Sequence, residues 1–386
     1  MRSTILLLCG LILASTTLSG GAASQPHDPA WLGKPMPVAD GVDLFRIDAT
    51  MALASAPQPR SVRLLRLDPR RVRLSSALAT GIVPGRATVA DIARRTRAVA
   101  AVNAGFFGPT GDPNGLLKID GRLLSDTRRA RGAVAIVDGP GGVNLHFDQV
   151  SARVRARFKA GGQWRTVPVD GVDTRRAARA LVLYTPASGA TTGTQAGLEW
   201  ELRGTPLRAS PGSAAGNTAI PAAGYVLSYG AASTPAALTG LLRAPAVQIR
   251  ESIAVVSGER TRDWVRAPTI VGGAGLLLRA GQRLADWAVE KLSPGFDTTT
   301  HPRTLIARDR AGRIWLVTVD GRQPGLATGA SFADLHVLLE RLDVVDALNL
   351  DGGGSTTMVV RDAVVNRPSD LTGPRPVSDA LVIHTR

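Results

Sequence analysis

The segment from Asn349 to Thr357 holds the most unusual group of potentially reactive side chains in the sequence, with Asp351, three glycines at 352–354 and Ser355 in succession. Glycine loses more chain entropy on folding than other residues, so this run indicates a backbone that bends sharply or approaches a ligand closely. Its unhindered amides can cradle an anion beside Asp351. A P-loop is excluded, because no Gly-Lys-Ser/Thr follows. The alternative is a tight glycine hairpin without a ligand.

A second group reads His-Pro-Arg-Thr over residues 301–304, at the start of an expected strand. Arg303 can hold a phosphate or carboxylate through two parallel N–H donors. A lone arginine is more often a surface or ion-pair residue, and His301 is more often a structural histidine than a catalyst. Both interpretations stay open on the sequence.

Two further places offer a carboxylate and an aromatic ring. Asp320 and Arg322 flank Gly321, although Asp-Gly is ordinarily a turn, as we expect in a hairpin at residues 120–121. Phe106 lies three positions after Asn103 and can line a sugar site, although a pair of phenylalanines more often packs in a core.

The elements around these residues are mostly strands. Apolar and alternating runs predict strands, at about residues 61–78, 98–102, 133–137, 143–147, 304–307, 314–319, 344–350 and 356–360, and a hairpin over 116–124. Thr88 can cap a short helix over 89–96. Ser331 opens a second helix with Asp334 at capping-box spacing. The sequence therefore predicts an α+β fold of strand-rich, mixed sheets with a few packed helices.

The middle of the chain, about residues 151–259, gives fewer signals. Residues 180–184 and 225–228 are strand-like, and the connections around 206–223 are rich in Pro, Gly, Ala and Ser. We interpret it as an inserted, variable lobe. The expected catalytic domain covers residues 24–386, with its core at about 59–150 and 260–386.

The first residues are typical of a signal peptide over residues 1–23. Arg2 precedes an apolar run over 5–14, and small residues 21–23 fit a cleavage site. The only cysteine, Cys9, lies in that run, which leaves no thiol for catalysis or metal binding in the mature chain. No later run is long enough to span a membrane. We therefore expect an exported protein, periplasmic or extracellular, without an integral membrane segment.

The formal net charge of +15 comes almost entirely from scattered arginines. Alternating charges over residues 153–159 predict one cationic strand face, either simply solvated or attracting anionic envelope polymers. Nucleic-acid binding is disfavoured, because aromatic residues are few and no reader motif is present.

Taken together, six short segments resemble the phosphodiester glycosidase family, in order and spacing as well as in residues. They are Asn103-Ala-Gly-Phe-Phe, His301-Pro-Arg-Thr, Val319-Asp-Gly-Arg, Asn349-Leu-Asp-Gly-Gly-Gly-Ser, Asn366-Arg-Pro-Ser-Asp and Arg375-Pro-Val-Ser. The clear match covers about residues 100–150 and 300–386. Two residues depart from the pattern: Ala104 replaces a glycine, and Asp379 stands where bacterial relatives often carry asparagine.

The resemblance implies hydrolysis of a bond between a sugar's anomeric carbon and a phosphodiester oxygen, in a phosphorylated glycan or envelope polysaccharide. Glycoside cleavage usually needs two carboxylates, and Asp351 and Asp320 are the candidates. The phosphate is expected to bind to Arg303, with Arg322 or Arg375 and the amides of Gly352, Gly353 and Gly354.

The remaining expected residues would bind the sugar or hold the carboxylates in place. They are Asn103, Phe106, His301, Thr304, Asn349, Ser355 and Asp370. A calcium ion held by aspartates and loop carbonyls is compatible with the sequence, but no EF-hand spacing supports one, and no other cofactor is implied. Two other functions stay open: a non-catalytic protein that binds anionic polysaccharide, and a hydrolase of ordinary glycosides.

Overall fold

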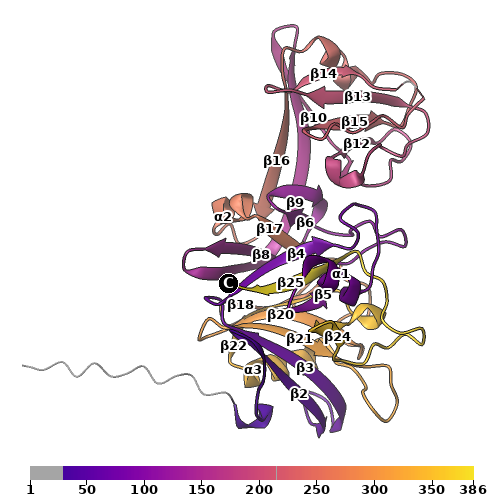
Figure 1. Cartoon of the computed structure of the whole chain (residues 1–386). Coiled ribbons are helices and arrows are strands. Elements are labelled where there is room, and N and C mark those ends of the chain that lie inside the picture. Colours follow the sequence, from indigo (N-terminus) through magenta and orange to yellow (C-terminus); the bar gives the residue numbers. More distant parts are fainter. Residues whose placement is uncertain (1–28, 214) are drawn as a thin grey trace, which may run out of the picture.

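A computed structural model describes residues 29–213 and 215–386, which form four sheets and three short α-helices (Figure 1). The predicted signal peptide lies outside the described residues. The strand-rich α+β class expected from the sequence is confirmed. Within the described residues, no helix combines the length and apolar character needed to cross a membrane.

The largest sheet has eight strands. In spatial order they are β1 (Met36–Ala39), β2 (Val42–Met51), β3 (Gln58–Leu67), β21 (Ile314–Val319), β20 (Arg303–Asp309), β22 (Val344–Asn349), β18 (Leu276–Arg279) and β19 (Gln282–Arg283). One face packs on helix α3 (Phe332–Arg341), whose stripe of buried leucines and Phe332 forms a core with Trp315. The predicted capping box is present, since Ser331 accepts from the Asp334 amide and Asp334 accepts from the Ser331 amide.

A five-stranded sheet packs against the other face of the eight-stranded sheet. Its order is β24 (Ala363–Val364), β23 (Met358–Val360), β5 (Ala100–Asn103), β25 (Asp379–Thr385) and β4 (Val72–Leu78). Helix α1 (Val89–Thr96) covers it, and the predicted cap is present, because Thr88 accepts from the Asp91 amide at 3.1 Å. Apolar residues of the two sheets share one buried cluster, so strands from both ends of the chain are locked together.

The third sheet connects the core to the middle of the chain. It contains β10 (Gln163–Pro168), β9 (Gly142–Ala160), β8 (Thr127–Gly139), β17 (Thr269–Gly272), β6 (Leu117–Ile119) and β7 (Arg122–Ser125), with β16 (Val247–Val255) also paired to β9. The predicted hairpin is β6–β7. The structure joins two predicted strand segments into β9, a single strand of 19 residues. Its inward residues are buried and its cationic residues at 153–159 face outward, as the alternation predicted.

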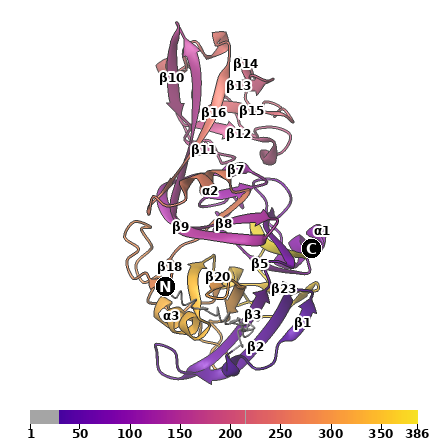
Figure 2. The same cartoon turned by 90° about the vertical axis from the view of Figure 1, so that its left-hand side faces the viewer.

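The fourth sheet, which we call the outer sheet, stands apart from the core, beyond the long strands β9 and β16 (Figures 1 and 2). Its order is β11 (Gly171–Val172), β12 (Leu181–Tyr184), β15 (Gly224–Tyr229), β13 (Leu198–Arg203) and β14 (Arg208–Pro211). These strands fall within the segment expected to form an inserted lobe. The remaining elements are short, namely α2 (Thr261–Arg266) and the 3-10 turns η1 (Ala30–Leu32), η2 (Pro186–Ser188), η3 (Ala236–Leu238), η4 (Leu241–Arg243) and η5 (Gly353–Ser355).

Candidate functional site

The glycine segment passes from one sheet to another. It leaves β22 of the eight-stranded sheet and enters β23 of the five-stranded sheet, so the hairpin alternative is wrong. A Cβ on Gly352 would lie 2.6 Å from the carbonyl oxygen of Pro302, and Gly353 has a φ of 60°. Close backbone approach and a left-handed residue therefore explain the glycines at these two positions.

Asn103, at the end of β5, fastens this loop. Its amide nitrogen donates to the carbonyl oxygen of Asp351 at 2.7 Å. Its amide oxygen accepts from the Thr304 hydroxyl at 2.7 Å and from the backbone N–H of Thr357 at 3.1 Å. These bonds lie in a buried interior where losing one partner is costly. Asn103 and Thr304 thus hold the loop that carries Asp351 and are themselves covered.

Asp351 presents the reactive group of the loop. Its carboxylate is partly exposed and accepts from the Gly352 amide at 2.9 Å. Burial raises the pKa of Asp351 to about 6, and the nearby charge of Asp379 adds to this, while the Gly352 amide and Arg375 oppose it. The carboxyl therefore titrates closer to neutral pH than an ordinary aspartate does, which is the range useful to a general acid or base.

Two guanidinium groups lie directly over the glycines. A Cβ on Gly353 would be 3.1 Å from two Arg322 nitrogens, and one on Gly354 would overlap Arg375 and Asp370. Arg375 donates two parallel hydrogen bonds to Asp370, at 2.8 and 3.0 Å, with 41% of its side chain exposed. The arrangement places accessible positive charge beside Asp351.

His301 lies next to Arg322 at the edge of this group. Its Nδ1 is 3.4 Å from an Arg322 nitrogen. Partial burial lowers the pKa of His301, and the charges of Arg322 and Arg303 lower it further. The imidazole is therefore neutral at pH 7 and can offer one donor or acceptor to a sugar hydroxyl.

Asp320 lies behind the loop and is only 1% exposed. It accepts from the Ser61 hydroxyl at 2.7 Å, the Asn366 amide at 2.8 Å and the Arg367 backbone N–H at 3.0 Å. Burial raises its pKa despite these donors. Asn366 in turn donates to the carbonyl of Thr356 at 3.1 Å. This placement makes Asp320 a support for the loop and argues against direct contact with substrate.

Arg303 points away from Asp351 into the protein and is 2% exposed. Its nitrogens donate to the carbonyl oxygens of Ala330, Phe296 and Thr299 at 2.7–3.0 Å, and its guanidinium lies over the rings of Phe296 and Phe332. Burial lowers its pKa to about 10. The geometry therefore argues against Arg303 as a phosphate ligand.

The other expected residues differ in their exposure to solvent. Asn349 and Ser355 are buried, and Asn349 donates to the carbonyl of Ala274 at 2.8 Å. The amides of Gly352 and Gly353 already donate to Asp351 and Pro302, so these two amides are not available to the expected anion cradle. Phe106 is partly exposed, with its ring 6.2 Å from that of Phe296.

Sequence reasoning did not assign Asp379, Asn366 and Phe296 to the site. Asp379 lies near Asp351, because the backbone of Ala104 bonds to both residues. The Ala104 N–H donates to the Asp379 carbonyl oxygen at 3.2 Å, and the Ala104 carbonyl oxygen accepts from the Asp351 N–H at 3.0 Å. The buried Asp379 carboxyl accepts from Ser378 and Gly105, and burial raises its pKa. The sequence signal for Asp379 was its position directly after the Arg375-Pro-Val-Ser segment. Phe296 lies in a loop that carries no recognisable motif.

The residues present do not fit a calcium site. Between residues 29 and 386, position 214 apart, no three His, Cys, Asp or Glu side chains gather as metal ligands. Asp320 and Asp370 are committed to protein donors, whereas calcium takes six to eight oxygen ligands. No step below is routed through a metal.

Comparisons with known proteins identify similar sequences and folds. Residues 197–384 match the family model described as phosphodiester glycosidase. An 88-residue segment is 36% identical to the N-acetylglucosamine-1-phosphodiester alpha-N-acetylglucosaminidase of Bos taurus, covering 21% of this chain and 16% of that protein. The enzyme of the same name from Homo sapiens matches equally, over 17% of its length. The match thus spans about a sixth of these curated relatives.

Two solved structures share the fold over most of the chain. A hypothetical protein from Synechocystis has a TM-score of 0.73 at 24% identity, covering 92% of this chain and 64% of that one. A candidate exported protein of Burkholderia pseudomallei has a TM-score of 0.69 at 24% identity, covering 86% of this chain and 75% of that one. Residues 197–384, just under half of the chain, are thus similar to the phosphodiester glycosidase family.

Proposed function

We propose that this protein hydrolyses the bond between the anomeric carbon of a sugar and a phosphodiester oxygen in a glycoconjugate or envelope polysaccharide. The observation that carries the proposal is a carboxyl with a pKa of about 6, Asp351, followed along the loop by glycines over which the guanidinium groups of Arg322 and Arg375 lie. The names of the curated relatives supply the bond type, which comes to this chain only as part of the proposal.

The chemistry follows from the charges. At pH 7 most of Asp351 is ionised, and the carboxylate attacks the anomeric carbon or takes a proton from an attacking water. The C–O bond breaks with its electron pair on the phosphate oxygen. Arg322 and Arg375 stabilise that growing negative charge, which reduces the need for a separate proton donor. Water is added overall, giving a free sugar and a phosphomonoester.

The neighbouring groups position the reactants. Asn103 and Thr304 fix the loop, and Asp320 supports it from behind through Asn366. His301 and Phe106 lie where a hydroxyl donor or acceptor and an apolar sugar face can be met. Fixed positions such as these reduce the entropy lost on reaching the transition state.

Phosphorus NMR of the protein with a GlcNAc-1-phospho-6-mannose diester tests the proposal, with Asp351→Asn as the comparison. We expect the diester signal to convert to monoester with the wild type alone. Arg322→Ala should slow conversion by about 100-fold, since it removes a charge that acts mainly in the transition state. Conversion of plain glycosides but of no phosphodiester would overturn the proposal in favour of an ordinary glycosidase.

Silence across a panel of phosphodiesters and glycosides would instead favour the binding protein that the sequence left open. Export is part of the same proposal. It rests on the signal-peptide pattern of residues 1–23 and not on the described structure.

A further inference from the structure

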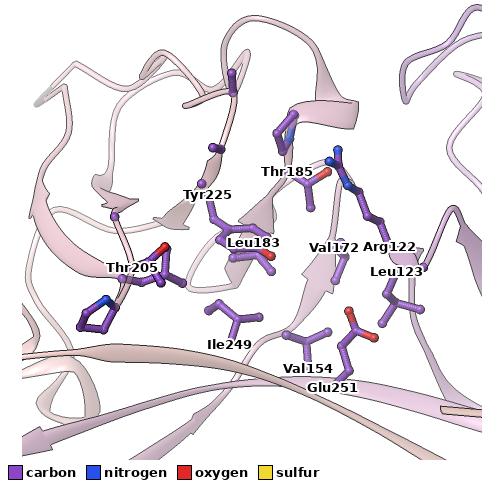
Figure 3. A pocket seen from close by; sticks show the side chains of 18 residues that line it. Arg122, Leu123, Val154, Val172, Leu183, Thr185, Thr205, Tyr225, Ile249 and Glu251 are labelled. Carbon is purple, nitrogen blue, oxygen red and sulfur yellow. The ribbon is translucent and has the colours of Figure 1, made fainter. Parts of the chain in front are cut away.

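A cavity lies away from the glycine loop, where hairpin β6–β7 and the long strands β9 and β16 meet the outer sheet. Its volume is about 400 Å³, within the range of small-molecule sites. Hairpin β6–β7 forms one wall, the strands β9 and β16 form the floor, and β12 and β15 of the outer sheet form the far wall (Figure 3). Three parts of the chain distant in sequence therefore build it together.

The floor and inner wall of the cavity are apolar. The side chains concerned are Leu123, Val154, Val172, Leu183, Leu207 and Ile249. Most of them belong to the buried cluster that joins the core to the outer sheet. The apolar surface is thus held rigidly and does not depend on a bound partner for its shape.

Polar groups surround this floor at its rim. In Figure 3 Arg122 stands on one side, Tyr225 and Thr205 stand on the other, and Glu251 rises from the floor. The Glu251 carboxylate is 3.6 Å from the Lys118 ammonium and remains 36% exposed. Among the described residues, neither the Arg122 guanidinium nor the Tyr225 hydroxyl has a hydrogen-bond partner. Donors and an acceptor are therefore available at separate points of one opening.

We propose that this cavity binds a sugar residue of an oligosaccharide. A pyranose ring has an apolar face of C–H groups and a rim of hydroxyls, which match the Tyr225 ring and Leu183 on the one hand and Glu251 and Arg122 on the other. The Glu251 carboxylate accepts hydroxyl or amide protons, and the Arg122 guanidinium donates to hydroxyl oxygens, so the cavity offers both kinds of partner to an uncharged sugar unit.

The choice of a glycan as the ligand rests on the proposed function. A cavity remote from Asp351 would hold a neutral part of a long substrate while the phosphodiester lies at the glycine loop. Binding energy gained away from the reacting bond lowers KM for an extended glycan without changing the chemistry of the reacting centre. A short diester that cannot reach the cavity gains nothing from it.

The test measures binding of chitotriose and mannotriose to the full chain by saturation-transfer NMR and titration calorimetry. We expect at least one trisaccharide to bind, and Tyr225→Ala and Glu251→Gln each to weaken it by about tenfold. Trp164→Ala is the matched control, because Trp164 is an exposed aromatic residue of β10, at 44%, that does not line the cavity. Thermal unfolding of each variant establishes that it is folded.

The proposal is overturned if neither sugar binds with a Kd below about 10 mM. It is equally overturned if folded Tyr225→Ala and Glu251→Gln bind like the wild type. Neither sugar contains phosphate, so hydrolysis plays no part in the readout. Binding that persists in a protein without turnover would reject the proposed reaction alone, and turnover without trisaccharide binding would reject this cavity alone.

Discussion

Burial of the Asp351 carboxyl raises its pKa, and it also destabilises the folded state at neutral pH. A pKa of about 6 in place of 3.8 means that the folded state holds a proton more tightly than the unfolded chain. Between pH 4 and pH 6 the folded state therefore binds more protons, and stability falls as pH rises. We expect Asp351→Asn to be more stable than the wild type at pH 7.5, by up to about 3 kcal/mol, and to lose that advantage near pH 4.

Urea unfolding at the two pH values checks this expectation. Asp40→Asn serves as the control, because Asp40 is an exposed residue paired with Arg71, and such pairs contribute at most about 1 kcal/mol. An advantage for Asp351→Asn that is the same at both pH values would mean that the carboxyl is not shifted in the folded protein.

Residue type and motif spacing indicated where the reactive groups gather, but not which way each one points. Arg303 and Arg322 come from neighbouring motifs, yet Arg303 is sealed under three carbonyl oxygens while Arg322 lies over Gly353. Asp320 and Asp351 likewise differ in exposure and in the donors that they meet. The direction in which a side chain points depends on strand register and on the packing of loops such as the one that carries Phe296. Neither can be predicted from a short segment of sequence.

Local elements were the most predictable level. The caps at Thr88 and Ser331 and the β6–β7 hairpin depend on residues a few positions apart, and all are present. The glycine loop could not be predicted in this way, because its course depends on β22 and β23 belonging to different sheets. The pairing of β23 with β5 joins residues more than two hundred positions apart, such as Met358 with Val102.

The close fit of the loop under its guanidinium groups gives a prediction for Gly354. Its backbone suits other residues, since its φ is not positive, but a Cβ there would overlap the Arg375–Asp370 pair. We expect Gly354→Ala to displace Arg375 and to lower kcat/KM by about 100-fold, the usual effect of a misplacement near 1 Å. Kinetics with the phosphodiester provide the measurement.

The control for this change is Gly141→Ala, where an added Cβ meets open space. It should leave kcat/KM unchanged. Overpacking at Gly354 should cost about 1–3 kcal/mol of stability, so the folded fraction is measured alongside. A fully active, folded Gly354→Ala protein would show that Arg375 does not need its present position.

The long strand β9 connects the two parts of the structure. Sequence patterns marked its inner and outer ends separately, because the polar residues between them interrupt the apolar alternation. The structure makes one strand of them, which pairs with β8 near the core and with β10 and β16 farther out. Two strands of the outer sheet, β12 and β15, were predicted from the sequence, but β11, β13 and β14 were not, because they are short and separated by Gly- and Pro-rich connections.

The outward face of β9 concentrates part of the +15 charge. Arg157 and Lys159 lie over the ring of the exposed Trp164, and Arg155 contacts the Ser252 hydroxyl at 3.3 Å. Binding to such a cationic face releases the counterions condensed on a polyanion, so the binding is steeply salt-dependent. We expect the triple variant Arg155→Ser, Arg157→Ser, Lys159→Ser to elute from immobilised dextran sulfate at lower salt than the wild type.

A triple variant with the same loss of charge elsewhere separates the local face from net charge. Arg46→Ser, Arg70→Ser and Arg73→Ser remove three exposed positive charges from strands β2 and β4 and the turn between β3 and β4. If the β9 face attracts polyanions, only the first variant elutes distinctly earlier. Equal shifts would mean that net charge alone governs retention. No shift from the β9 variant would make that face an ordinary solvated sheet surface, whose charges serve to keep the strand soluble.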